Sequence, residues 1–482
     1  MLRQRTFFLP LFVTVLVTSL FIVSCATPGN RVAAVRPIDD AVPPVDEPVD
    51  EVDEADLPDE QELAGMVVTA LRAGNADEAR SLLEQIGPPP AVPELWLAYG
   101  HVRLADGDIA AADAVYRLVA GHPSAVQADA LYVRALITDD SSEAEGLLLH
   151  AIEVEPDHVG AGAALGTIAF ADGRTRDAER YFQTALNADP EHFGSLVGMA
   201  RINIDRPPRR VALEYIDRAL SVDPEAGFVH AERGRVLAIL RRTNESVESY
   251  QTAIALEPQS PWHRYDLGRV LQEAGRHQEA VDRFNEAIGL NSDVFLFFFH
   301  RANSLYAVGR YQDALADYIH VLSVEPGYRD AFAPFAATSF LTGDFAQAAR
   351  YFERTFDELH RVPSFALLTG IALRQDGRQT QANQWFEQVR RLAGTDSLYS
   401  QIAVEFVRPR NDDLTIRRIQ SNRDAATRAR MSFYLGALYA MLGRTALADA
   451  LLENARVPEI EGSIEFELAG WFLDTYGQGH AR

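Results

Sequence analysis

The chain has 482 residues and a formal net charge of −24. All 45 basic residues are arginine, which excludes chemistry that needs a lysine, such as a P-loop phosphate site, a pyridoxal Schiff base or a lysine nucleophile. The acidic balance disfavours nucleic-acid binding, since affinity there depends on neutralising phosphates, and the single cysteine excludes an intrachain disulfide or a cysteine-based metal cluster.

Residues 1–24 have the pattern of a signal peptide. Two arginines precede an apolar run that ends at Val23, and the run is short for a membrane span of about 20 residues. Ser24 then stands directly before the lone Cys25, an arrangement that resembles a bacterial lipobox. The resemblance implies cleavage before Cys25 and a lipid anchor, including palmitate, on that residue. The alternative is a short N-terminal anchor helix with an incidental cysteine.

Residues 25–59 are expected to form an acidic, proline-rich tether. Twelve acidic residues and no basic residue lie between Asp39 and Glu62. Such a segment buries too little apolar surface to offset its chain entropy, and its charges repel one another. Ala26 follows the cysteine, where an aspartate in bacterial lipoproteins favours retention at the inner membrane. The lipoprotein resemblance therefore implies an outer-membrane protein that faces the periplasm.

A 34-residue pattern repeats without insertion in the units that begin at residues 125, 159, 193, 227, 261, 295, 329 and 363. A small residue recurs at position 8, glycine at position 15, alanine at position 20, a large residue at position 24 and proline at position 32. In the unit 261–294 the small and large residues are Gly268, Gly275, Ala280 and Phe284. Small residues allow two helices to approach, the glycine ends the first helix, and proline ends the second.

This pattern resembles the tetratricopeptide repeat (TPR). The resemblance implies an all-α protein, a right-handed α-solenoid of about twelve helix pairs with a C-terminal capping helix. The array is expected over 60–458, and 459–482 is expected to contain the capping helix and a tail. The pairs at 60–92 and 93–124 match the pattern less well, 397–428 is degenerate, and 429–458 returns to the pattern.

Nothing in the sequence indicates an enzyme, a cofactor or a metal site. The sequence lacks the HExxH and GxSxG motifs. Gly160, Gly162 and Gly166 approach a dinucleotide fingerprint, but no strand precedes them, so helix packing explains them better. His300 follows three phenylalanines and is expected to be a partly buried helix residue rather than a metal ligand.

The TPR resemblance places positions 2, 5, 9 and 12 of each first helix on the concave face. Arginine or asparagine recurs at position 9 in four consecutive units, and aromatic residues occupy the neighbouring positions. Arginine suits carboxylates, and aromatic faces supply contact area at low entropic cost. The candidate partner-binding residues are Arg201, Arg235, Arg269, Asn303, Phe228, Trp262, Tyr265, Phe299 and Tyr306.

A purely structural role for the arginines is the alternative. Glu232 and Asp266 lie three residues before Arg235 and Arg269, where they can pair with them. Repeat duplication also copies residues without any ligand.

The sequence therefore predicts a non-catalytic scaffold that binds proteins or peptides in the bacterial cell envelope and touches the membrane only through its lipid. Two alternatives stay open. One, for which the resemblance gives a precedent, is an accessory component of a solute-uptake or secretion system that presents a ligand to a transporter. The other is an enzyme that uses an unrecognised site.

Overall fold

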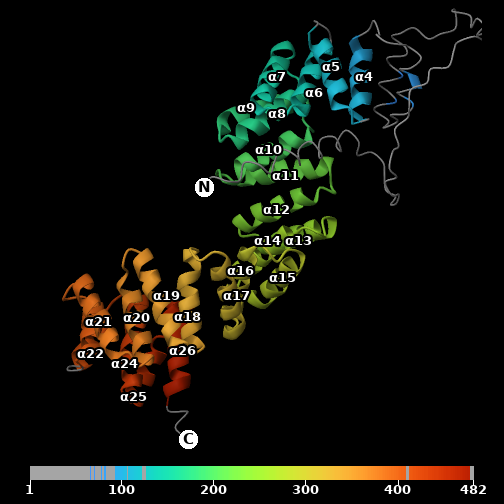
Figure 1. Ribbon diagram of the computed structural model, residues 1–482. Coiled ribbons are helices and arrows are strands. Elements are labelled where there is room, and N and C mark those ends of the chain that lie inside the picture. The colour runs from blue at the N-terminus through green and yellow to red at the C-terminus, as the bar shows by residue number, and fades with distance from the viewer. Residues whose placement is uncertain are drawn as a thin grey trace, which may run out of the picture. The chain divides into compact units, whose positions relative to one another are not determined.

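The computed structural model describes residues 66, 70, 78, 81, 82, 93–105, 107–121, 126–408 and 412–477. The predicted signal peptide, Cys25, the tether and most of the first expected helix pair lie outside these residues. The chain divides into two compact units, 1–224 and 225–482. The helices of each unit are coloured along the chain in Figure 1.

From residue 93 onward the N-terminal unit consists of four helix pairs, in which each helix packs against its successor. Their bounds are α4 Pro93–Ala105, α5 Ile109–Ala120, α6 Gln127–Ile137, α7 Ser141–Val154, α8 Val159–Ala171, α9 Thr175–Ala188, α10 Phe193–Ile204 and α11 Arg210–Val222.

The C-terminal unit continues the same plan with seven helix pairs and one further helix. The pairs are α12 Gly227–Ile239 with α13 Thr243–Leu256, α14 Pro261–Glu273 with α15 His277–Leu290, α16 Phe295–Ala307 with α17 Tyr311–Val324, α18 Phe332–Leu341 with α19 Phe345–Glu358, α20 Pro363–Gln375 with α21 Gln379–Ala393, α22 Leu398–Val407 with α23 Asp412–Ser421, and α24 Ala425–Met441 with α25 Thr445–Glu453. The last helix is α26, Ile464–Tyr476. Within the described residues every regular element is helical, so the predicted all-α solenoid of TPR-like pairs is confirmed.

Contact between a small residue and a large ring explains how several of the pairs close. A Cβ atom added to Gly268 in α14 would lie 2.6 Å from the ring of Phe284 in α15. At Gly370 in α20 the same atom would lie 2.4 Å from the ring of Phe386 in α21. Both rings are fully buried. The predicted pairing of positions 8 and 24 is therefore a direct steric match between the two helices.

Most of the described turns between paired helices use the left-handed backbone conformation that the repeat pattern predicts. Gly275 has φ 74° and Gly309 has φ 78°. Arg241 occupies the same position between α12 and α13 and has φ 61°. A side chain in this region is disfavoured sterically, so the turn at Arg241 is held by the packing of the two helices around it.

The second helices end just before the repeat prolines. Helices α13 and α17 end at Leu256 and Val324, two residues before Pro258 and Pro326. The residue before a proline is restricted to extended conformations, which ends the helix there.

Helix α26 caps the last pair and also reaches further back along the same unit. It packs against α24 and α25, as the capping prediction requires, and also against α18. Leu468, Ala469 and Phe472 of α26 are fully buried. The Trp471 ring lies 5.1 Å from the ring of Phe340 in α18, between centroids.

Helix α26 also makes hydrogen bonds with helices from earlier repeats of the same unit. The Tyr476 hydroxyl donates to Gln375 Oε1 in α20 at 2.9 Å, and the Tyr311 hydroxyl in α17 donates to Glu467 Oε2 at 3.2 Å. Helices far apart in the sequence are thus joined through the last helix of the chain.

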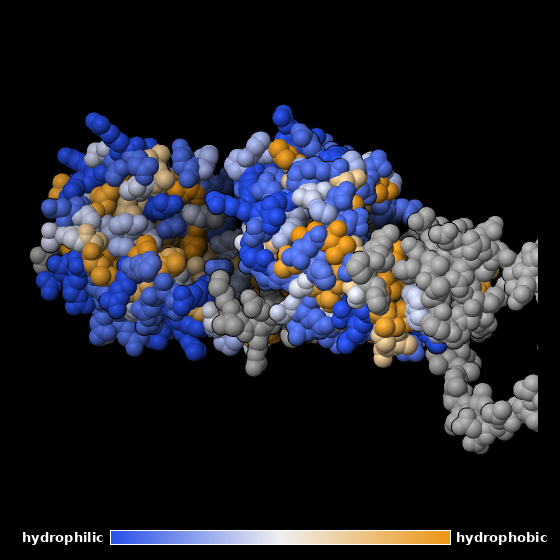
Figure 2. Space-filling view, turned by 90° about the horizontal axis from the view of Figure 1, so that it is seen from above, coloured by the Kyte–Doolittle hydropathy of each residue, from blue (hydrophilic) through white to orange (hydrophobic). Residues whose placement is uncertain are grey.

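Large apolar side chains exposed on the surface are dispersed along the helices rather than confined to one segment. In the view of Figure 2 the orange apolar side chains are interspersed with blue polar ones. Among the helices that the structure describes, none combines the length and the apolar character needed to cross a membrane.

Candidate binding surfaces

Two neighbouring first helices, α12 and α14, present the same pair of residue types at the same repeat positions. Phe228 and Trp262 occupy position 2, and their side chains are 38% and 48% exposed. Arg235 and Arg269 occupy position 9 and are also exposed. We call these four residues the aromatic–arginine surface. Packing between α12 and α14 places the two sets on adjacent helices of one unit.

Both arginines of this surface already have carboxylate partners on their own helices. Arg235 Nη2 lies 2.7 Å from Glu232 Oε2, and Arg269 Nη2 lies 3.6 Å from Glu273 Oε1. Exposed pairs of this kind contribute little to stability, usually below about 1 kcal/mol. The alternative in which the arginines pair with carboxylates of the chain itself thus holds for Arg235, which contacts Glu232 as expected. Arg269 contacts Glu273 instead of the expected Asp266. These guanidinium groups can exchange one carboxylate for another at low cost.

The aromatic residues at position 5 belong to the interior. Tyr265 and Phe299 are only 7% and 8% exposed. The Tyr265 ring packs against Phe297, with ring centroids 5.0 Å apart, and Trp262 packs on the same ring at 5.2 Å. Tyr265 and Phe299 therefore hold the first helices together, and Trp262 forms the outer edge of their cluster.

Asn303 and Tyr306 in α16 also make internal contacts. Asn303 Oδ1 accepts a hydrogen bond from the Tyr318 hydroxyl at 2.6 Å. The Tyr306 ring packs 5.5 Å from that of Tyr311, and burial, with the nearby Glu467 carboxylate of α26, raises the pKa of Tyr306 well above its usual value. This end of the predicted surface is covered by the chain's own last helix.

Arg201, the remaining member of the predicted set, is exposed on α10 of the N-terminal unit. The other candidates lie in the C-terminal unit. The surface that can be described within one compact unit therefore begins at α12.

Buried ionisable groups lie beneath the aromatic–arginine surface. Burial raises the pKa of Asp266, although Arg269, His263 and Arg235 oppose the shift. Burial, reinforced by Arg269, lowers the pKa of His300 to about 4. The neutral ring keeps Nδ1 within 3.0 Å of Gln272 Oε1, which confirms the prediction of a partly buried helix residue. Its low pKa keeps His300 neutral at physiological pH.

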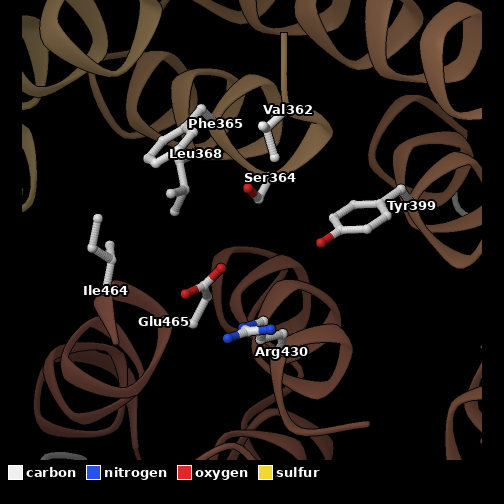
Figure 3. A pocket seen from close by; sticks show the side chains of 8 residues that line it. All are labelled: Val362, Ser364, Phe365, Leu368, Tyr399, Arg430, Ile464 and Glu465. Atoms are coloured by element: carbon white, nitrogen blue, oxygen red, sulfur yellow. The ribbon is translucent and has the colours of Figure 1, made fainter. Parts of the chain in front are cut away.

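A second feature of the C-terminal unit is a cavity of about 320 Å³ bounded by α20, α22, α24 and α26. Four polar side chains, one from each helix, line it: Ser364, Tyr399, Arg430 and Glu465. Its apolar wall consists of Val362, Phe365, Leu368 and Ile464. Figure 3 shows the hydroxyls of Ser364 and Tyr399 and the Glu465 carboxylate directed towards the space between the helices.

Sequence reasoning did not single out this cavity, although part of its signal was present. Ser364 and Arg430 occupy position 2 of the units that begin at 363 and 429, the same position as Phe228 and Trp262. Glu465 lies outside the repeats, and only the return of α26 onto α24 brings it there.

The described residues hold no group of three or more histidine, cysteine, aspartate or glutamate side chains arranged to bind a metal ion. Their polar clusters pair arginines and histidines with carboxylates, amides and hydroxyls.

The repeat family is supported by comparison with known families. Residues 265–322 and 342–397 match one tetratricopeptide repeat model, and residues 63–85 match a second. The matched segments include all of α15, α16, α19, α20 and α21 and agree with the helix pairs described above. No curated protein matches the sequence.

Several solved structures are similar to parts of the chain. A crystal structure of MamA is 18% identical with a TM-score of 0.32, and the match covers 35% of this chain and 92% of that one. PilF of Pseudomonas aeruginosa is 20% identical, with a TM-score of 0.38, and the match covers 41% and 90%. PilW, described as a type IV pilus biogenesis factor, is 19% identical, with a TM-score of 0.36 and coverage of 44% and 98%.

Proposed function

We propose that this protein is a non-catalytic scaffold of the bacterial cell envelope, held at a membrane by lipid on Cys25, that binds proteins or peptides through its aromatic–arginine surface. Tetratricopeptide repeats generally mediate contacts between proteins. The observation that carries the proposal is the recurrence of an exposed aromatic and an exposed arginine on the adjacent helices α12 and α14.

The chemistry of this surface suits a peptide with apolar and acidic side chains. Trp262 rests edge-on against Tyr265 and Phe297, so its ring is held in place before a partner arrives. A preorganised aromatic residue loses little entropy on binding. Arg235 and Arg269 can transfer from their exposed pairs with Glu232 and Glu273 to a partner's carboxylates.

Charge reversal tests the surface. Arg235→Glu combined with Arg269→Glu is expected to release partners that the wild-type chain captures from envelope extracts. The matched control is Arg180→Glu with Arg210→Glu, because these arginines are 63% and 79% exposed and also pair with carboxylates one turn away. If the α12–α14 variant retains every partner, the proposed surface is wrong.

Photo-crosslinking adds a positional test. A photoreactive residue in place of Trp262 should form partner adducts, whereas one in place of Ile319, which is 50% exposed on the second helix α17, should not. Equal adducts from both positions would contradict binding through α12 and α14.

Lipid attachment is tested separately. Cells that express the wild-type chain and receive radioactive palmitate are expected to label it, and Cys25→Ala should abolish the label. An unlabelled wild-type chain would refute the anchor and the envelope localisation together.

A further inference from the structure

The cavity between α20, α22, α24 and α26 combines two opposite charges with an apolar wall. Glu465, at the start of α26, is only 7% exposed. Its Oε1 accepts a hydrogen bond from the buried Tyr434 hydroxyl at 2.6 Å. Its Oε2 makes no hydrogen bond or ion pair with any described residue. This oxygen is not fully enclosed by protein atoms, so it is accessible from the cavity. One oxygen is therefore fixed by the protein, and the other is left for the cavity.

Arg430 supplies the positive charge. It lies in α24, is half-buried and lines the cavity with Glu465. No residue that the structure describes forms a hydrogen bond or an ion pair with its guanidinium group. A half-buried guanidinium has five N–H donors in a planar fork, which fits the two oxygens of a carboxylate.

The two charges act on the same neighbouring hydroxyl. Burial, assisted by Glu465, raises the pKa of Tyr399, and Arg430 opposes that shift. Tyr399 therefore lies within the fields of both groups and remains a neutral hydroxyl at physiological pH. With Ser364 it offers donors and acceptors between the charges.

A buried carboxylate oxygen without a hydrogen-bond donor and a half-buried guanidinium without an ion pair are costly to desolvate. A ligand that carries an ammonium and a carboxylate satisfies both at once. The apolar wall beside them, formed by Phe365, Leu368 and Ile464, suits a hydrocarbon side chain. The volume of about 320 Å³ is at the small end of the range for ligand sites, about 300–1,000 Å³.

We propose that this cavity binds a free α-amino acid with an apolar side chain. The α-carboxylate lies on Arg430, the ammonium on Glu465 Oε2, and the side chain against Phe365, Leu368 and Ile464. The site is separate from the aromatic–arginine surface, so either proposal can fail without the other. Such a ligand would be consistent with a role in handling solutes.

Calorimetric titration of the full-length chain tests the site with four probes. L-phenylalanine and L-leucine are expected to bind. N-acetyl-L-phenylalanine lacks the ammonium, and L-phenylalanine amide lacks the carboxylate, so each should bind at least about tenfold more weakly. Derivatives that bind as well as the amino acid would show a merely apolar pocket and overturn the proposal.

Substitutions of Arg430 and Glu465 test whether each charge contributes to ligand binding. Arg430→Gln and Glu465→Gln are each expected to weaken L-phenylalanine binding by about tenfold or more. The glutamine at 465 can still accept from Tyr434, so the fold is expected to persist, and helical circular dichroism checks it. Matched controls are Arg417→Gln and Glu461→Gln, which change exposed residues outside the cavity.

The variants also show which ligand group each charge binds. Arg430→Gln should reduce discrimination between L-phenylalanine and its amide, and Glu465→Gln should reduce discrimination against the N-acetyl derivative. If a folded wild-type chain binds neither amino acid at millimolar concentration, or if the controls lose as much affinity as the site variants, the proposal is wrong.

Discussion

At the scale of single residues, the glycine at position 8 is where the repeat is most sensitive to change. Gly370 faces the buried ring of Phe386, and an added Cβ atom would lie 2.4 Å from it. No shift of a flexible chain end can relieve this contact, because the atom it meets belongs to a ring packed against Phe406.

We therefore expect Gly370→Ala to lower the free energy of unfolding by about 1–3 kcal/mol, the usual cost of overpacking a core. Gly289→Ala is the matched control. Gly289 is exposed in α15 and an added Cβ would meet nothing within 4 Å, so alanine there should stabilise the helix by about 0.5–1 kcal/mol. Urea unfolding of both variants measures the difference, and a loss of stability in both would contradict the steric explanation.

His300 makes a prediction about pH. In the folded chain its pKa is about 4, against its usual value of 6.5. Between these values the unfolded chain binds a proton that the folded chain does not, so stability falls as the pH falls from 6.5 towards 4. The full difference corresponds to about 3 kcal/mol.

His300→Gln should remove this part of the pH dependence, and urea unfolding at pH 7 and at pH 4.5 measures it. His150→Gln, at an exposed position of α7, is the control and should keep the wild-type slope. If His300→Gln and the wild-type chain show the same pH dependence of stability, the His300 ring of the wild type is not held neutral.

At the scale of elements, the difference between the repeat helices and α26 matters most. Repeat helices pack on sequence neighbours, and their pattern of small and large residues predicts their contacts. The α26 contacts with Phe340, Gln375 and Tyr311 have no counterpart in the repeat pattern. Only the three-dimensional path of the chain produces them.

Phe472 tests how firmly α26 is held. Its ring is fully buried and lies 5.9 Å from that of Phe340 in α18 and 6.2 Å from that of Phe433 in α24. Phe472→Ala should cost about 3–5 kcal/mol, because it removes a buried ring and leaves a cavity. Leu442→Ala is the control, since Leu442 is 46% exposed at the end of α24 and should change stability by less than about 0.5 kcal/mol. A small effect at Phe472, measured by thermal or urea unfolding, would show that α26 is only loosely attached.

At the scale of the whole molecule, α26 changes how the C-terminal unit is expected to unfold. A solenoid whose repeats touch only their neighbours can open locally from its ends. Here α26 joins α17, α18 and α20 to α24. We expect the amides of α16–α25 to exchange with solvent deuterium as one cooperative group.

Removal of residues 464–482 should divide this group, so that α22–α25 exchange faster than α16–α18. Removal of 478–482 alone is the control and should leave the pattern unchanged. If the longer deletion slows or preserves exchange throughout, α26 does not link these repeats.

The sequence alone determined the repeating unit. Gly268 and Phe284 predict how α14 meets α15, and Gly275 predicts the turn between them, because steric contact and backbone conformation are local and recur every 34 residues. The same reasoning predicted Trp262 and Arg269 as partner-binding residues of the concave face, and both side chains are exposed. It overestimated the exposure of Tyr265 and Phe299, because their burial depends on rings contributed by neighbouring units.

Only the tertiary structure decided where α26 lies. No periodic signal marks its partners, since burial of Leu468 and Phe472 depends on surfaces from α18 and α24, which are distant in the chain. The same return places Glu465 beside Arg430 in one cavity. The helix pairs could be predicted from the sequence because each pair is held by contacts that are local and repeated. The cavity could not, because it forms only when residues from four helices are brought together.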